Sequence, residues 1–188
     1  MSNLPGIIRD SDGKDILADS LSSAMVVIDH PHRKIHDGRH WIYTNSFEIV
    51  SVGAIKWHHF RTPNTTTQQH ILFGGEASGL AAICFFEAPT MPTGAGTNTA
   101  RGIENQNRRS TNTTSSIIYQ DPTVGAGETG TCLFTSRVGG AGVGQSKYPG
   151  SIRSEDEFIL AANTSYLLKC GALVASITGS IFMNWYEV

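Results

Sequence analysis

The chain has 188 residues, of which 39% are apolar and only 16% are charged, and its formal net charge is −2. This balance lacks the basic excess that is typical of nucleic-acid binders, and no apolar run approaches the ~18–20 residues of a membrane span. We therefore expect neither nucleic acid nor membrane among its partners. The length suits one β domain with its own core and a short additional arm.

The first 35 residues contain short apolar groups separated by polar, turn-forming residues. Residues 16–25 are compatible with a short helix, and residues 26–29 with a short strand that ends at His30-Pro31-His32. Because such a segment buries little surface of its own, we predict an extended arm over residues 1–35 that contacts another protein. An ordinary strand packed on its own sandwich is the alternative. The contact candidates are Ile7, Ile8, Ile16, Leu17, Val26, Val27 and Ile28.

Residues 36–188 are rich in short β-branched and aromatic runs separated by turn signals. Asn163-Thr164 and Thr178-Gly179-Ser180 are read as turns, and residues 89–98 and 139–150 as exposed loops. Many short strands without a long helix predict an all-β fold, an antiparallel β-sandwich that is jelly-roll-like. The expected strands are 41–51, 54–62, 69–76, 80–87, 99–103, 115–120, 128–136, 157–160, 166–170, 174–177 and 181–187.

The last expected strand has two different faces. Ile181, Met183 and Trp185 fall on one side, because successive side chains of a strand point to opposite faces. Phe182 and Tyr186 fall on the other side, which mixes aromatic and polar residues. We therefore take Phe182 and Tyr186 as candidates for contact with another copy of the chain.

Seven histidines raise the question of a metal site of the kind found in cupin-type jelly rolls. His30-Pro31-His32 precedes the expected sheet and is interrupted by a proline. His58 and His59 are adjacent on a strand and should point to opposite faces, so they cannot share one site without a bulge. We expect no metal and no other cofactor, and a cupin-like metalloenzyme is kept as an alternative.

Several other motifs are better explained by structural roles than by binding or catalysis. The glycine-rich segment 139–144 lacks the following helix of a phosphate loop, and residues 155–157 read as a solvated turn. Arg108 and Arg109 could bind an anion, but their forked guanidinium groups more commonly bind loop carbonyls or a neighbouring chain, which makes them oligomer-contact candidates. Three widely spaced cysteines indicate free thiols. We expect no catalytic residue.

The order of several segments resembles a family of tailed-bacteriophage head decoration, or cement, proteins. The resemblance covers about residues 35–188. It rests on His36-Asp37-Gly38-Arg39-His40, Thr62-Pro63-Asn64, His70, Phe86-Glu87-Ala88-Pro89-Thr90, Asn105-Gln106-Asn107-Arg108-Arg109-Ser110, residues 160–168 and the terminal Trp185-Tyr186-Glu187. Such a resemblance implies a jelly-roll-like domain on the outside of the phage head, usually in a symmetric oligomer and without enzymatic activity.

The resemblance therefore predicts a structural virion protein, made in the host cytoplasm, that binds the major capsid protein and itself, as a trimer. A ligand that binds the assembled lattice but not free subunits stabilises the lattice by mass action. A host-binding head-fibre or tail module that recognises surface glycans is the second hypothesis. Its site would lie in the loops 91–98 and 139–150.

Overall fold

The computed structural model describes residues 8–9, 15–16, 30–90, 97–98, 102–126, 129–140 and 157–188. The chain divides into two units, residues 1–33 and 34–188. In the first unit, β1 (Ile8–Arg9) and β2 (Asp15–Ile16) form an antiparallel pair in which Ile8 and Ile16 are opposite each other. Most of the predicted arm lies outside the described residues, including its candidates Ile7, Leu17, Val26, Val27 and Ile28.

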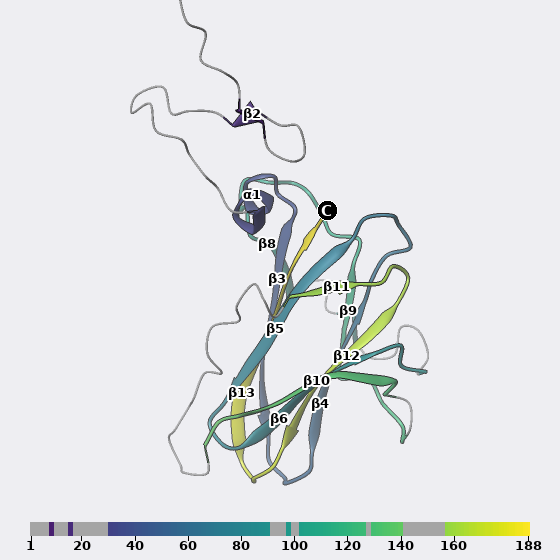
Figure 1. Cartoon of the computed structure of the whole chain (residues 1–188). Coiled ribbons are helices and arrows are strands. Elements are labelled where there is room, and N and C mark those ends of the chain that lie inside the picture. Colours follow the sequence, from purple (N-terminus) through teal and green to yellow (C-terminus); the bar gives the residue numbers. More distant parts are fainter. Residues whose placement is uncertain are drawn as a thin grey trace, which may run out of the picture. The chain divides into compact units, whose positions relative to one another are not determined.

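The second unit is an antiparallel β-sandwich, as the sequence predicts. One sheet has the order β10-β6-β12-β4-β9-β7 and the other β11-β5-β13-β3-β8 (Figure 1). The elements are α1 (His30–His36), β3 (His40–Ile49), β4 (Ile55–Arg61), β5 (Gln69–Ala77), β6 (Ala81–Glu87), β7 (Thr97–Asn98), β8 (Ile103–Asn105), β9 (Ile117–Gln120), β10 (Thr131–Val138), β11 (Phe158–Leu160), β12 (Ser165–Ala172) and β13 (Ile177–Glu187).

The pairing of the strands is that of a jelly roll. β3 pairs with β13, β4 with β12, β5 with β11 and β6 with β10, so the first four long strands pair with the last four in reverse order. The connection from β6 to β10 supplies three more strands. β8 extends one sheet beside β3, whereas β9 extends the other beside β4 and carries β7 on its far side.

The core lies between the two sheets and is rich in aromatic rings. Phe73 and Phe85 approach across the sheets with 4.3 Å between ring centroids, and Phe60 meets Trp185 edge-on at 5.3 Å. Ile181, Met183 and Trp185 are all buried, which confirms their predicted shared face. Burying such rings removes a large apolar area from water and is the main source of stability of the sandwich.

The helix α1 at His30–His36 corrects the sequence analysis, which placed no helix there. Proline is tolerated in the first turn of a helix, since the first N–H groups have no intrahelical partner. The expected turn at Asp37-Gly38 is the end of this helix. Gly38 has φ of 68°, its N–H donates to Ile35 O, and Arg39 N–H donates to Lys34 O, the pattern of a Schellman cap.

The expected turn at Thr178-Gly179-Ser180 is also wrong, because β13 runs straight through it. A Cβ at Gly179 would lie 2.3 Å from Glu76 O and 2.7 Å from the Phe47 ring. Glycine is therefore needed here for a close approach between neighbouring strands. The chain turns instead at residues 173–176, where a strand was expected.

Candidate interaction surfaces

The sandwich has two ends with different chemistry. We call proximal the end at which β3, β5 and β12 begin and β4, β6 and β13 end. We call distal the opposite end, formed by the connections 50–54, 78–80 and 173–176. Antiparallel pairing gathers residues that are far apart in the sequence at each end.

Three asparagine side chains of the 105–112 segment bind the last carbonyls of α1 and its cap. Asn107 Nδ2 donates to His36 O at 2.9 Å, and Asn105 Nδ2 donates to Gly38 O at 2.9 Å. Asn112 Nδ2 reaches Asp37 O and Gly38 O, each at 3.3 Å. The last carbonyls of a helix have no intrahelical donor, so these amides satisfy groups that would otherwise need water.

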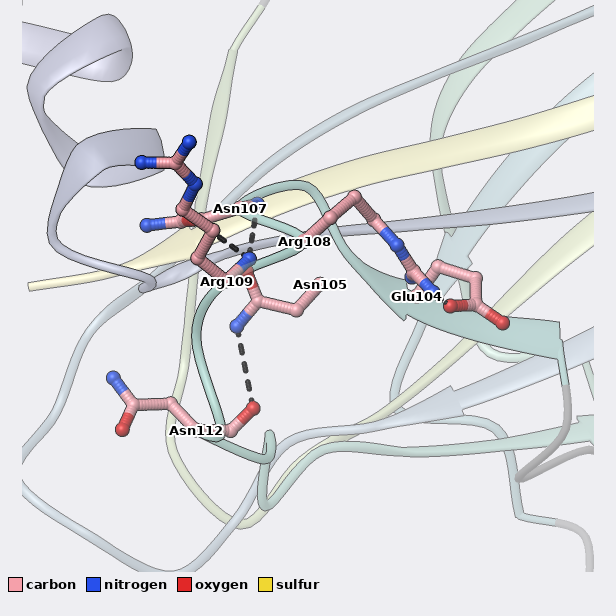
Figure 2. Close-up of polar contacts among 6 residues, drawn as sticks. All are labelled: Glu104, Asn105, Asn107, Arg108, Arg109 and Asn112. Atoms are coloured by element: carbon pink, nitrogen blue, oxygen red, sulfur yellow. Dashed lines mark hydrogen bonds and ion pairs between the residues drawn. The ribbon is translucent and has the colours of Figure 1, made fainter.

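The same segment is held by bonds of its own. Asn105 Oδ1 accepts from Asn107 N–H, and Asn107 Oδ1 accepts from Arg109 N–H. The Arg108 guanidinium pairs with Glu104, whereas the Arg109 side chain extends from the other side of the segment (Figure 2). Both arginines are exposed, and their proposed contact with another chain stays a prediction. The exposed Arg108–Glu104 pair contributes little to stability.

Gly38→Ala is expected to lower the free energy of unfolding by about 3 kcal/mol, as measured by urea denaturation. The positive φ disfavours a side chain, and a Cβ would lie 2.1 Å from Ser110 Oγ. Gly53→Ala is the matched control, because Gly53 has φ of 79° but nothing within 4 Å of a Cβ. It should cost about 1 kcal/mol. Adding Ser110→Gly to Gly38→Ala should restore part of the loss, and equal losses for both alanine variants would contradict the steric account.

A second set of bonds joins the end of β4 to the turn before β12. Thr62 N–H donates to Thr164 O at 3.0 Å, and Thr62 Oγ1 donates to Ala161 O at 2.7 Å. Asn163 N–H donates to Pro63 O, and its φ of 52° confirms the predicted turn at Asn163-Thr164. Through these bonds, two more segments that carry the resemblance meet at the proximal end.

Tyr166 connects this turn to the end of β6. Its hydroxyl accepts from Ala161 N–H at 2.8 Å and donates to Glu87 Oε1 at 3.0 Å. Burial raises the pKa of the Tyr166 hydroxyl well above its usual range, and the Glu87 carboxylate acts in the same direction. This hydroxyl therefore stays protonated and acts as a structural donor.

Tyr186 is stacked between His70, at 4.8 Å between ring centroids, and His40, at 6.1 Å. Its hydroxyl donates to Glu157 Oε1 at 2.8 Å, and His70 Nδ1 contacts the same carboxylate. Burial and the Glu157 carboxylate raise the pKa of Tyr186. Because Tyr186 is only 5% exposed, it has little surface left for the predicted contact with another copy.

Phe182 is better placed for the contact predicted from the last strand. It lies on the outer face of its sheet, opposite Thr44 of β3 and Gly74 of β5, and it is half-buried. No described contact tests the prediction that it meets another copy, which stays a prediction.

The distal end carries a group of exposed aliphatic side chains, which we call the distal cap: Val50, Val52, Ile55 and Leu173. Val50 and Val52 are 65% and 64% exposed. Bonds from Gly53 N–H to Ala172 O and from Ser176 N–H to Val50 O hold the two connections together. Sequence reasoning missed this surface. Its only signal is valine on either side of Ser51, in a segment that also reads as a turn.

The adjacent histidines of β4 point to opposite faces, as predicted. His58 lies in the core, where its ring meets Tyr43 at 5.7 Å and its Nε2 accepts from Asn45 Nδ2 at 3.0 Å. His59 lies on the outer face, stacked on Tyr119 at 5.4 Å. Burial lowers the pKa of each imidazole to about 4. Both rings are therefore neutral at pH 7.

One pair of side chains has the geometry of a nucleophile and a base. Ser165 Oγ lies 2.9 Å from His59 Nε2. The Nδ1 of His59 is buried and has no carboxylate to orient the ring among the residues that the structure describes. A pKa of about 4 also makes His59 a weak base at pH 7. This pair reads as a structural bond between β4 and β12.

Within the described ranges, no three His, Cys, Asp or Glu side chains are grouped closely enough to hold a metal ion. Cys84, Cys132 and Cys170 are free thiols there, and burial raises the pKa of Cys170 to about 12. No described helix has the length and apolar character to cross a membrane. Comparison of the chain with protein-family models, curated proteins and solved structures finds no match.

Proposed function

We propose that this chain is a structural virion protein that binds the outer surface of a bacteriophage capsid and stabilises the shell. Its partners would be the major capsid protein and further copies of itself, as a trimer, and it would have no catalytic role. The observation that carries the proposal is the distal cap, a group of exposed aliphatic side chains at one end of a jelly roll. Exposed aliphatic side chains that gather at one end of a domain favour a contact with another macromolecule.

The resemblance to head decoration proteins adds support, because the segments that carry it belong to one structural unit. Residues 36–40 bind residues 105–112, residues 62–63 bind residues 161–164, and Glu87 binds Tyr166. The segments that carry the resemblance thus supply bonds that hold the proximal end of the jelly roll.

The physical mechanism would be mass action on the assembled lattice. The distal cap exposes four side chains, which is far less surface than the ~800 Å² per partner of a standard interface. One such contact is weak, so binding would need a second contact, for which the first 33 residues and the symmetric copies are the candidates. A protein held by contacts with several capsid subunits binds the lattice and not free subunits.

Co-sedimentation with capsids from a phage that lacks this gene tests the proposal. The full chain should pellet with these capsids, and Val50→Ser with Val52→Ser should weaken binding at least ~10-fold because the exposed apolar contact is lost. Ile159→Ser is the matched control, since Ile159 is an equally exposed aliphatic residue, 63%, on β11. A chain starting at residue 30 should keep α1 and its bonds to the 105–112 segment, yet bind less well if the arm contributes.

Absence of binding by the full chain would overturn the proposal. Binding by the full chain that is unchanged in the Val50/Val52 variant and lost on truncation would move the contact from the distal cap to the first 29 residues. Circular dichroism of each variant checks that the β fold is intact.

A further inference from the structure

A cavity of about 290 Å³ opens at the edge of the sandwich where β8 and β9 lie. Trp41 of β3, Ile103 of β8 and Ile117 of β9 line it. The segment between β8 and β9 adds Asn112, Thr113, Thr114 and Ser116, and β8 adds Asn105. The lining thus combines an indole and two aliphatic side chains with amides and hydroxyls, and none of its side chains is charged.

Trp41 lines this cavity and carries a buried hydrogen-bond donor without a partner among the described residues. It is 3% exposed, and its Nε1 has no acceptor in the part of the chain that the structure describes. Trp185, which stacks on Trp41 at 6.4 Å, has its own Nε1 paired with Thr114 Oγ1. Buried donors are normally paired, so the contrast between these two indoles points to an acceptor that this chain does not provide.

The chemistry of the lining restricts what an occupant can be. A phosphate, carboxylate or ammonium group would lose its hydration without meeting an opposite charge, which disfavours ionic ligands. A ligand with hydroxyl groups can accept from Trp41 Nε1 and donate to the hydroxyl or amide oxygens of the rim, while its carbon skeleton contacts the aliphatic walls. A cavity of 290 Å³ has room for one ring of that kind.

The rim is also held in place before any ligand arrives. Asn105 and Asn112 both bind Gly38 O, and Thr114 Oγ1 accepts from Ser116 N–H and donates to Glu187 Oε1. A ligand that moves part of this rim must therefore compete with these bonds, which limits its affinity.

We propose that this cavity binds a neutral sugar residue, with Trp41 Nε1 as the central donor. The inference does not depend on the proposed capsid function. It assigns glycan recognition to Trp41 and residues 103–117. The sequence had suggested the loops 91–98 and 139–150 for such a role. A small shift of the 112–116 segment would let a sugar hydroxyl reach Trp41 Nε1.

Saturation-transfer NMR and tryptophan fluorescence of the full chain test the proposal with a panel of glucose, galactose, mannose, N-acetylglucosamine and N-acetylgalactosamine. At least one sugar should bind saturably, with Kd of ~1–10 mM. Trp41→Phe keeps an aromatic ring but removes the donor, and it should weaken binding at least ~10-fold. Trp57→Phe is the matched control, because Trp57 does not line the cavity.

Thr113→Phe decides the question if Trp41→Phe unfolds the chain. Thr113 is exposed on the rim, so a phenyl group there should block the cavity without touching the core, and binding should be lost. No saturable binding of any sugar in the panel overturns the proposal, as does binding that both variants leave unchanged. Binding of inorganic phosphate that Thr113→Phe abolishes would overturn the assignment to a neutral ligand.

Discussion

Lowering the pH from 7 to 5 is expected to remove about 4 kcal/mol from the free energy of unfolding, because two buried histidines must stay neutral. Burial is the main cause that lowers the pKa of His58 and of His59 to about 4, against 6.5 for an exposed imidazole. Lys56 adds to the effect at His58 and Arg61 at His59, whereas Asp121 opposes it at His58.

The sign follows from proton binding. Between pH 6.5 and pH 4 the unfolded chain binds protons at these imidazoles and the folded chain does not, so acid favours unfolding. Each histidine contributes about 2 kcal/mol of the loss at pH 5, and the loss levels off below pH 4. Burial also lowers the pKa of His40, so His40 acts in the same direction.

Urea denaturation at pH 7, 6 and 5 measures this loss. His58→Gln and His59→Gln should each remove about half of the pH dependence, whatever they do to stability at pH 7. His36→Gln is the control for the loss of a histidine side chain, because His36 is exposed. A free energy of unfolding that is flat between pH 7 and pH 5 would refute the assignment of buried neutral imidazoles.

Trp185→Ala is expected to cost about 4 kcal/mol at pH 7, the second large effect. Trp185 is fully buried, contacts Phe60 across the two sheets, and stacks on Trp41 within its own sheet. Its indole nitrogen also donates to Thr114 Oγ1 at 3.3 Å. Removal of the ring leaves a cavity where the sheets meet, which adds to the lost transfer free energy.

Two further variants separate packing from hydrogen bonding. Trp185→Phe keeps most of the ring contacts and should cost about 1–2 kcal/mol, chiefly through the lost bond to Thr114. Trp57→Ala should cost less than Trp185→Ala, because Trp57 is half-buried on the outer face of its sheet. If urea denaturation gives equal losses for the two alanine variants, Trp185 is not central to the core.

The two ends of the sandwich differ in how much stabilisation a partner would gain by covering them. The proximal end is closed by many side-chain bonds to backbone carbonyls, whereas the distal end is closed by short connections with aliphatic side chains in solvent. Covering exposed aliphatic groups with a partner stabilises the complex, whereas covering polar groups that are already hydrogen-bonded contributes little. This difference favours the distal end as the contact surface.

Much of the fold could be predicted because alternation along a strand is a local property. The burial of Ile181, Met183 and Trp185 follows from the period of two, as do the opposite faces of His58 and His59. Short runs with turn signals also indicated an all-β sandwich. Local patterns failed where a contact overrides propensity. Gly179 reads as a turn residue, yet it is in β13 because only a residue without Cβ fits against Glu76 O.

The sequence by itself thus determined the class of the fold, the inward faces of the strands and the absence of basic character. Only the tertiary structure decided which strands pair, which loops meet and which aliphatic residues stay exposed. Asn107 binds His36 O across 71 positions, and Thr62 binds Ala161 O across 99. Such bonds depend on the path of the whole chain, and no local pattern encodes them. For the same reason, the sequence does not distinguish Val50 and Val52 from core valines, although both are exposed in the folded sandwich.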